Sequence, residues 1–596
     1  MRRSQIVGGA GPGAMLDLPR HAVIVSGLDE WGNPQERQFE RIDDERVRSR
    51  LEKKLQLPGL QLYSPPAEGD TFGQTLKPGL TVWQFPEWFV TQASLEGRPG
   101  VRPLVHRRSL QHGQYLDDDG KKHKVVPVRF VRACKNGHLD DIDWARFAHR
   151  ENAVRCGRRL LWTERGASSD FVDMFVECEC AQFPARSLIE ATKPGILGRC
   201  FGKRPWLNDE EGACVAKDGT PVDLRLLVRH ASNAYFGIIE RSISIPEPEQ
   251  ELREAVGKVY DLIMNAEDEG LLNYERKKPV VQAAIGRFSN AVVLAELQRR
   301  KDGQGVDPRK QKYAELDTFL AVKGQEGVNN SRSTFFAREQ PLAAPRPKIL
   351  EPFSKVLKVE RLREVSVMRG FTRFEAPSPD IDGELDLDVR LGALARDLKW
   401  LPAVENRGEG LFFGFERTTL NEWLKKPAVK ARKEQLRAAW DAWARPRGIK
   451  KEAPPIEYVM LHSLSHLLLT QLSLDCGYSA SSIRERIYVE EKGAGILLHT
   501  GTPDAEGTLG GLVNAARDLE GLVRGALELG AFCSNDPVCS QHRFDDVHEE
   551  RFLHGAACHG CVLLPETSCE MRNDLLDRAL VVETVDSLGC EFFETA

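Results

Sequence analysis

The chain has 596 residues, of which 41% are hydrophobic and 29% charged, and its formal net charge is −5. This length exceeds one hydrophobic core, so we expect an α+β protein of several domains with cysteine-rich zinc-binding elements in its N-terminal half and at its C-terminus. No apolar stretch approaches the roughly twenty residues of a membrane span, and none follows the two N-terminal arginines, so the sequence argues against a membrane or secreted protein and predicts a cytoplasmic one.

In chain order, apolar periodicity and turn residues predict a series of strands and helices. Strands are expected at 21–25, 125–132, 171–180 and 496–500, and helices at 252–263, 420–443 (interrupted by Pro427), 458–472 and 512–529. The Pro- and Gly-rich stretch 302–355 is typical of a linker, an extended arm or a mobile loop. The expected division is a mixed region 1–124, a cysteine-rich α/β region 125–245, a helical region and linker 246–355, a mixed connecting region 356–454 and a zinc-binding domain 455–596.

Five cysteines lie close together near the C-terminus, and two of them form a Cys-x-x-Cys pair. A tetrahedral zinc site needs two pairs of thiolates, and Cys558 and Cys561 supply one pair. Cys533 and Cys539 are the expected partners, with Cys569 as a competitor. Because thiols stay reduced in a cytoplasmic protein, zinc is favoured over disulfide bonds or buried thiols. Four thiolates would form a closed structural site without room for a substrate water.

A second set of cysteines lies upstream and is less regular. The simplest four-thiolate grouping is Cys178, Cys180, Cys200 and Cys214, which predicts a second zinc site. A weaker grouping joins Cys134, His138, His149 and Cys156, for which a structural role is favoured.

Two histidines at helical spacing, His462 and His466, lie on one face of the expected helix 458–472. Metalloprotease helices share this spacing, but they carry a glutamate directly after the first histidine, where this chain has Ser463. A buried, hydrogen-bonded pair is therefore favoured over a catalytic metal site.

The chain contains no recognisable nucleotide-binding motif, because its glycine-rich segments lack the Gly-Lys-Ser/Thr ending of a phosphate-binding loop. Its net acidic charge also means that any nucleic-acid site must be local. Three basic segments are candidates for contacts with DNA phosphates, although a solvated surface is the default for any one of them. They contain Lys121, Lys122 and Lys124; Arg299, Arg300 and Lys301; and Lys425, Lys426 and Lys430.

The C-terminal motifs resemble a cysteine-bearing domain found at the C-terminus of certain bacterial DNA-repair helicases, in which the cysteines bind zinc. The resemblance covers roughly residues 455–585. It rests on His462-Ser-Leu-Ser-His-Leu, Gly507-Thr-Leu-Gly-Gly-Leu, Cys533 to Cys539 with Asp536-Pro537, Gly555-Ala-Ala-Cys-His-Gly-Cys561, Ser568-Cys-Glu570, Asn573 and Leu576-Asp-Arg578.

Nearly the whole chain resembles the DrmB proteins of the DISARM anti-phage system, which carry that domain without a helicase motor. The matching stretches are Arg3-Ser-Gln5, Gly11-Pro-Gly-Ala14, Cys134-x2-Gly137-His138-x2-Asp141 with Trp144, Arg229 to Phe236, Ser244-Ile-Pro246, Arg361 to Val365, Gly370-Phe-Thr-Arg373 and Gly408-Glu-Gly410. The resemblance implies a heterodimer with an SNF2-like, DrmA-like helicase, and joint engagement of foreign DNA.

Together these features predict a non-catalytic, zinc-binding helicase-associated subunit, with the ATPase on its partner and no membrane partner. Two alternatives remain open: a nuclease-like enzyme built around His462, His466 and nearby acids, and a scaffold without DNA contact.

Overall fold

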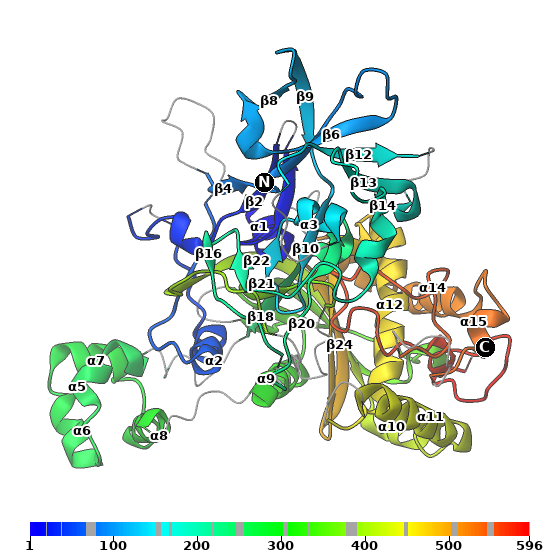
Figure 1. Cartoon of the computed structure of the whole chain (residues 1–596). Coiled ribbons are helices and arrows are strands. Elements are labelled where there is room, and N and C mark those ends of the chain that lie inside the picture. The colour runs from blue at the N-terminus through cyan, green and yellow to red at the C-terminus, as the bar shows by residue number, and fades with distance from the viewer. Residues whose placement is uncertain are drawn as a thin grey trace.

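The computed structural model describes residues 1–594 except 19–20, 37–38, 67–78, 151–155, 166–169, 217, 246–251, 253–254, 302–307, 330–333, 377–389, 446–450, 502–509 and 545–552. The described part is α+β and multidomain, as the sequence predicts, and is built around a large central sheet (Figure 1). The order within this sheet is β19-β20-β21-β22-β24-β23, with β18 pairing on β21 and β3 on β22. Its strands are β3 (Gln61–Tyr63), β18 (Phe236–Ser244), β19 (Val328–Asn329), β20 (Phe336–Gln340), β21 (Phe353–Thr372), β22 (Trp400–Phe415), β23 (Ile483–Glu490) and β24 (Gly493–Thr500).

Helices cover both faces of the central sheet, and most residues of β21 and β22 are accordingly buried, whichever face they point to. Successive residues along β22 point to opposite faces: Leu411 and Phe413 belong to one core, and Phe412 to another. Helix α12 (Ile456–Cys476) packs on the first face and α9 (Pro308–Ala321) on the second, on opposite sides of β24 in Figure 1. On the α9 side the ring of Phe319 stacks on Phe412, with centroids 4.7 Å apart.

The C-terminal region packs around α12, whose side chains are buried along most of its length. The helix ends at Gly477, which adopts the left-handed conformation with φ 69°. The neighbouring helices are α10 (Arg417–Trp423), α11 (Pro427–Ala444), α13 (Gly511–Ala515), α14 (Leu519–Ala531) and α15 (Val538–Gln541). The helical pattern predicted over 420–443 therefore divides into two helices, because Pro427 begins the second one.

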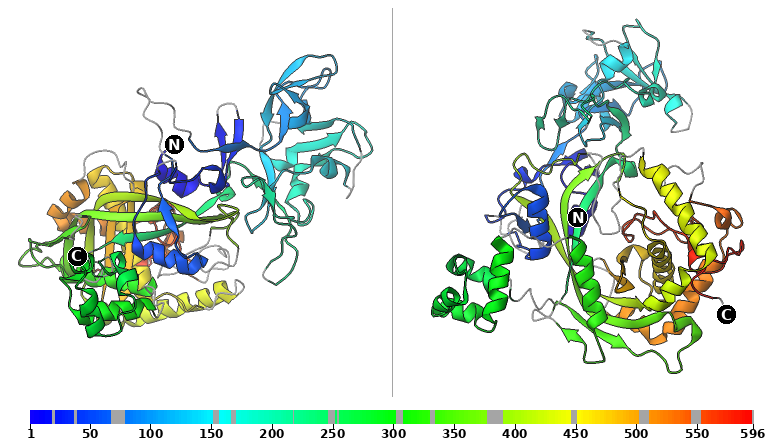
Figure 2. Two further views of the ribbon diagram at one scale, coloured as in Figure 1. Left: turned by 90° about the vertical axis from the view of Figure 1, so that its left-hand side faces the viewer. Right: turned by 90° about the horizontal axis from the view of Figure 1, so that it is seen from below.

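A second large sheet, with the order β14-β13-β12-β6-β5-β9-β8-β7, projects away from the central sheet (Figure 2, left). Its strands are β5 (Trp88–Thr91), β6 (Val101–His106), β7 (Leu110–Gln111), β8 (Gln114–Leu116), β9 (Lys122–Pro127), β12 (Leu160–Glu164), β13 (Met174–Cys178) and β14 (Arg186–Ser187). The other elements of the N-terminal part are small sheets and short helices: β1 (Met15–Leu18), β2 (His21–Val25), β4 (Val82–Gln84), β10 (Phe130–Ala133), β11 (Leu139–Asp140), β15 (Lys203–Arg204), β16 (Asp209–Glu210), β17 (Arg225–Val228), α1 (Arg3–Gly9), α2 (Glu45–Leu55) and α3 (Trp144–His149).

A group of short helices has a hydrophobic core of its own, which draws its residues from Leu252 to Leu297. Figure 1 and the right-hand view of Figure 2 show this helical group set apart from the rest of the molecule. Its helices are α5 (Tyr260–Ile263), α6 (Glu269–Glu275), α7 (Pro279–Ile285) and α8 (Asn290–Lys301).

Two expected borders differ from the observed elements. Strand β9 crosses the border at 124/125, and β21 crosses the border at 355/356. The described parts of 302–355 are also not a linker. In this stretch α9 covers one face of the central sheet and β20 pairs with β21. Both are held in place by apolar residues buried in the core, namely Phe319, Phe335 and Ala337.

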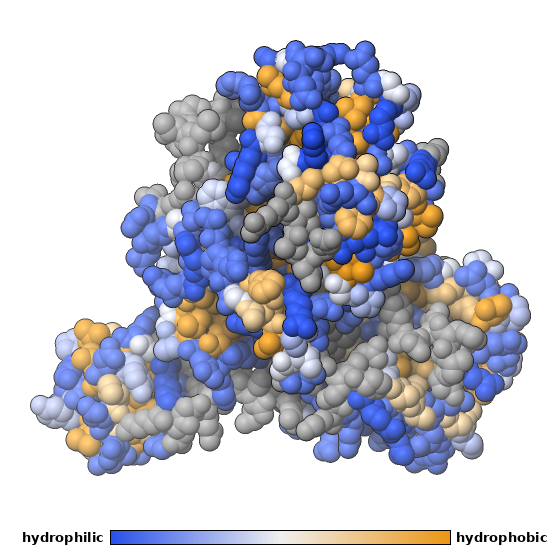
Figure 3. Space-filling model, in the orientation of Figure 1, coloured by the Kyte–Doolittle hydropathy of each residue, from blue (hydrophilic) through white to orange (hydrophobic). Residues whose placement is uncertain are grey.

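On the face shown in Figure 3, hydrophobic residues form separate small groups among predominantly hydrophilic ones. Among the described residues, no individual helix is long and apolar enough to cross a membrane. One pair of helices, Pro279–Ile285 and Asn290–Gln298, meets the length and composition criteria together, with a bend of 92° between them.

Candidate metal centres

Cys533, Cys539, Cys558 and Cys561 converge near the end of α14, and their sulfur atoms all lie within 4.8 Å of one another. The Cys533 and Cys558 sulfurs are 3.4 Å apart, those of Cys539 and Cys561 3.7 Å, and those of Cys558 and Cys561 3.8 Å. A Zn–S bond of about 2.3 Å separates the sulfurs of a tetrahedral site by about 3.8 Å. The four thiols therefore fit one zinc ion.

Backbone amides donate to three of these sulfurs, and for Cys533 and Cys558 the donor lies two positions further along the chain. The amide of Asn535 donates to Cys533 Sγ at 3.4 Å, and that of Gly560 donates to Cys558 Sγ at 3.3 Å. Each amide belongs to the residue two positions after the cysteine. A sulfur that accepts hydrogen bonds in this way is stabilised as the thiolate, which is the form that binds metal.

A buried ion pair fixes the turn that carries Cys533 and Cys539. The Asp536 carboxylate accepts hydrogen bonds from the Cys533 amide (3.0 Å) and the Ser540 amide (3.1 Å), and it pairs with the fully buried Arg578 guanidinium. Arg578 also donates to the Gly530 carbonyl at 2.7 Å, at the end of α14. The Asp536 and Arg578 side chains thus orient two of the four thiols.

The thiols of this group also influence one another's protonation. The hydrogen bond between Cys539 and Cys561 lowers the pKa of Cys561 to about 5 and raises the pKa of Cys539. Burial raises the pKa of Cys533 to about 11. One thiolate is therefore available at neutral pH as the first ligand, and a bound cation would favour deprotonation of the others.

Cys569, the competitor for this group, lies elsewhere. Its sulfur is 3.0 Å from His462 Nε2, in a separate buried group with His466 and Glu485.

The upstream cysteines form two groups that differ from both predicted groupings. Cys134, His138, Cys200 and Cys214 lie together, and so do His149, Cys156, Cys178 and Cys180. The predicted set Cys178, Cys180, Cys200 and Cys214 is therefore divided between the two groups, and the weaker set is divided in the same way.

Strand pairing explains this division. Strand β10 pairs with β17 and brings the segment of Cys200 and Cys214 beside Cys134, whereas β12 pairs with β13 and places Cys178 opposite Leu160, near Cys156. The sequence shows each local pair of ligands, but it does not show which pairs the strands bring together.

In the first upstream group, His138 Nδ1 lies 3.4 Å from Cys134 Sγ and 3.5 Å from Cys200 Sγ. Its other ring nitrogen, Nε2, lies 3.1 Å from the Glu211 carboxylate. The carboxylate accepts a hydrogen bond from a proton on Nε2. The lone pair of the neutral ring is therefore on Nδ1, which faces the sulfurs. Gly137, with φ 86°, allows the turn between Cys134 and His138.

Hydrogen bonds also support the two remaining thiols of this group. The hydrogen bond with Cys134 lowers the pKa of Cys200 to about 4, and the Gly202 amide donates to Cys200 Sγ at 3.4 Å. The Asn136 amide group donates to Cys214 Sγ at 3.2 Å.

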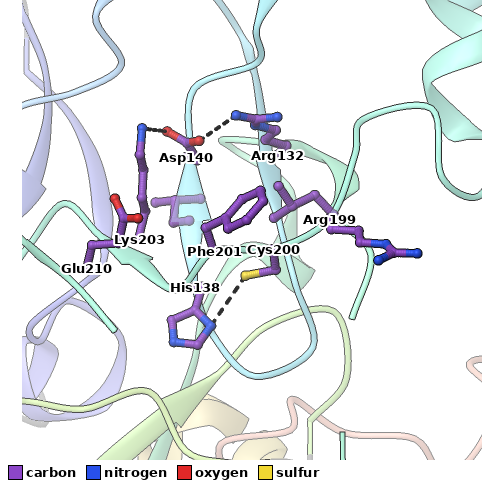
Figure 4. Close-up of a pocket in the computed structure, with 10 residues that line it drawn as sticks. Arg132, His138, Asp140, Arg199, Cys200, Phe201, Lys203 and Glu210 are labelled. Atoms are coloured by element: carbon purple, nitrogen blue, oxygen red, sulfur yellow. Dashed lines mark hydrogen bonds and ion pairs between the residues drawn. The ribbon is translucent and has the colours of Figure 1, made fainter. Parts of the chain in front are cut away.

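Beside this group is a cavity of about 190 Å³, whose lining is drawn in Figure 4. His138 and Cys200 lie at one end, and Asp140 lies between Arg132 and Lys203 at the other, at 2.6 and 3.1 Å. The cavity provides a route for an ion toward His138 and Cys200.

In the second upstream group the sulfurs of Cys156 and Cys178 are 3.7 Å apart, and Cys180 Sγ lies 3.3 Å from His149 Nε2. His149 ends α3, and its Nδ1 donates to the Ala145 carbonyl at 2.7 Å. Because a carbonyl only accepts, His149 Nε2 has a free lone pair that faces the thiols.

The three basic segments lie on separate parts of the molecule, on β9, α8 and α10–α11 (Figure 1). Lys121, Lys122 and Lys124 are exposed, as are Lys425 and Lys430. Two of the proposed contact residues are engaged within the fold. Lys426 donates to the Glu591 carbonyl at 3.2 Å, and Arg300 pairs with Glu296 at 2.8 Å. The side chains of Arg299 and Lys301 lie outside the described residues.

Two segments of the chain match known domain families. Residues 464–562 match the MrfA Zn-binding domain, and residues 2–236 match a domain of unknown function (DUF8724). The DISARM protein DrmB of Bacillus paralicheniformis is 34% identical over 494 residues, and the match covers 79% of this chain and 83% of that protein. This chain belongs to the DrmB family.

Zinc is the cofactor of this member of the DrmB family, since the matched zinc-binding domain contains a four-cysteine group of suitable geometry. That match spans Cys533 to Cys561 and begins after His462 and ends before Cys569. The two upstream groups lie within the domain of unknown function.

Proposed function

We propose that this protein is a non-catalytic, zinc-stabilised subunit of an anti-phage DISARM complex that pairs with an SNF2-like, DrmA-like helicase in the cytoplasm and helps it engage foreign DNA. The observation that supports the proposal best is the similarity to the DISARM protein DrmB along most of both chains. The helicase, the DNA and the division of labour between the subunits are inferred from the family resemblance.

The geometry of the metal groups supports a structural role for zinc. Catalytic zinc has three protein ligands and one position open to water or substrate. Each of the three cysteine-rich groups described above offers four protein ligands. They therefore suit closed sites that hold loops together, and the ATPase is assigned to the helicase partner.

DNA contact is proposed to be electrostatic and shared with the helicase. Lys430 and Lys433 are exposed at helical spacing on α11, close to the exposed Lys425, whereas Arg437 on the next turn pairs with Glu434 at 3.6 Å. The neighbouring Arg432 is buried in an ion pair with Asp577, at 2.7 Å, and is therefore not available to DNA. A short basic row of this kind suits the phosphate backbone and carries no base preference.

The test uses the complex of this chain with its helicase. Lys425→Glu, Lys430→Glu and Lys433→Glu together should weaken DNA binding to the same degree for unrelated sequences, and should make the dependence of log K on log salt shallower by about 0.9 for each phosphate that is no longer neutralised. Fluorescence anisotropy at several salt concentrations measures both effects. The control is Lys323→Glu, at an exposed lysine outside the three segments.

Each outcome has a clear reading. Unchanged affinity and salt dependence would remove α11 from the DNA contact, and the same result after charge reversal on β9 would favour a scaffold without DNA contact.

The purified chain alone should neither cleave labelled DNA with magnesium nor hydrolyse ATP. Cleavage that is lost in His462→Ala but retained in the control would favour the nuclease-like alternative.

A further inference from the structure

A fourth group of possible metal ligands lies in the core beneath α12. His462 and His466 project from adjacent turns of this helix, Glu485 lies on β23, and Cys569 lies in the C-terminal segment. All four side chains are buried, with at most 5% exposed, and their ligand atoms lie within 4.8 Å of one another. A carboxylate or thiolate in a protein core requires a partner of opposite charge.

The hydrogen bonds of the two histidines determine which ring nitrogens face the centre. His462 Nδ1 bonds to the Leu575 carbonyl at 3.2 Å, and His466 Nδ1 bonds to the Val562 carbonyl at 2.7 Å. Because a carbonyl only accepts, the proton of each neutral ring resides on Nδ1. Both Nε2 lone pairs therefore point into the group, which is the arrangement of metal-binding histidines held by carbonyl acceptors.

The atoms that meet at the centre are all acceptors in their metal-binding forms. His462 Nε2 lies 3.0 Å from Glu485 Oε1 and 3.0 Å from Cys569 Sγ, and His466 Nε2 lies 3.4 Å from the same carboxylate oxygen. The alternative to a metal ion is that both histidines are protonated on Nε2 and donate to these acceptors. Each Nε2 would then make a hydrogen bond, but His466 Nε2, although buried, makes none.

Cys569 resembles the cysteines of the other groups. Its sulfur accepts hydrogen bonds from the amides of Met571, at 3.3 Å, and Asn573, at 3.1 Å. Donation from the amide two positions after the cysteine also occurs at Cys533, Cys558 and Cys200. The backbone around Cys569 is thus arranged for a thiolate.

Glu485 is oriented by its neighbours, and the group can be reached from outside. The Glu570 amide donates to Oε1 at 3.1 Å, and the Ser465 hydroxyl donates to Oε2, so the carboxylate is held on both sides. Glu485 and Cys569 also line a cavity of about 720 Å³ between α1, β18 and the C-terminal segment. The group therefore has a satisfied outer shell and a path by which an ion can enter.

We propose that His462 Nε2, His466 Nε2, Glu485 Oε1 and Cys569 Sγ bind one zinc ion. Two neutral imidazoles, a carboxylate and a thiolate around a divalent cation carry no net charge, which suits a buried site. The mixture of nitrogen, oxygen and sulfur ligands suits zinc, and four protein ligands leave no position for a reacting water. The ion would join α12, β23 and the C-terminal segment, three elements that come from distant parts of the chain.

Anomalous scattering at the zinc edge, from crystals of the unmodified full chain, tests the assignment directly. We expect a peak at about 2.0–2.3 Å from the four named atoms. A map with peaks at the cysteine-rich groups but none between His462 and Cys569 would overturn the proposal. A peak that also persists below the zinc edge would overturn the assignment to zinc.

A pair of variants gives a second readout in solution. Cys569→Ala should lose one zinc per chain by elemental analysis, relative to the wild type. Cys590→Ala removes another buried thiol of the same core, which donates only to the Ala579 carbonyl, and should leave the zinc content unchanged. Unchanged zinc in Cys569→Ala would contradict the proposal. If that variant does not fold, the wild-type map decides.

Discussion

The histidines of the two upstream groups face their sulfurs with opposite ring nitrogens. His138 presents Nδ1 and holds its Nε2 proton on Glu211, whereas His149 presents Nε2 and holds its Nδ1 proton on a backbone carbonyl. The acceptor on the far side of each ring therefore decides which nitrogen is the ligand. Of these two hydrogen-bond acceptors, only Glu211 can be removed by a substitution, because the other is a backbone carbonyl.

Glu211→Gln should weaken zinc binding at the first upstream group by about 10–100-fold, the usual effect of losing an outer-shell carboxylate. The amide fills the same space but is a weaker acceptor for the imidazole proton. Competition with a chromophoric chelator measures the affinity. Glu210→Gln, at the exposed preceding residue, is the matched control, and equal affinities in the two variants would remove Glu211 from this role.

Cys561→Ser should remove one zinc per chain and unfold the C-terminal region. Structural zinc contributes on the order of 10–16 kcal/mol in small domains, which is comparable to the whole stability of a domain. Elemental analysis and thermal unfolding measure the two effects. Cys476→Ser, at a half-buried cysteine outside the four groups, should retain zinc, and a wild-type zinc content in Cys561→Ser would contradict the assignment.

At the scale of elements, a buried carboxylate joins three strands of the central sheet. Glu364 on β21 pairs with Arg484 on β23 and accepts a hydrogen bond from Asn406 on β22, at 3.4 Å. Burial alone would raise the pKa of Glu364, but the charges of Arg484, His499 and Arg241 lower it to about 2. Because the folded-state pKa lies below the ordinary 4.5, this carboxylate stabilises the fold above pH 4.5, and its contribution is lost as the pH falls toward 2.

Glu364→Gln should therefore lower the free energy of unfolding by roughly 3 kcal/mol at pH 7, since one pKa unit corresponds to about 1.4 kcal/mol. Denaturant unfolding between pH 7 and pH 3 measures the difference, which should narrow as the pH falls below 4.5. Glu360→Gln, on the same strand and in a more exposed pair with Arg338, is the control. A difference that is constant over this range would show that the charge of Glu364 is not responsible.

At the scale of the whole molecule, the helical group α5–α8 has a core separate from those of the sheets. Replacing residues 252–301 by a flexible linker should therefore leave the zinc content unchanged and shift the melting temperature by only a few degrees. Elemental analysis and calorimetry provide the readouts. Loss of zinc or aggregation of this deletion variant would show that the helical group stabilises the rest of the fold.

Local patterns predicted much of this architecture, and long-range pairing decided the remainder. The apolar run from Tyr458 predicts α12, and the spacing of Cys533, Cys539, Cys558 and Cys561 predicts the set of thiols that converge there. The upstream groupings were wrong because antiparallel pairing joins ligands that no local spacing connects. The polar stretch before β21 contains α9 and β20, whose few apolar residues are buried in the core of the central sheet and give no clear periodic pattern in the sequence.

The parallel pairing of β3 with β22 places Gln61 opposite Trp400, which follows it by about 340 residues. At a synthesis rate of about 5–20 residues per second, the ribosome needs roughly 20–70 s to supply the second strand after the first. During that interval Leu62 and its apolar neighbours have no sheet to join and are open to chaperones or to a neighbouring nascent chain. The yield of this subunit in cells should therefore depend on how well the N-terminal segment is protected until the central strands appear.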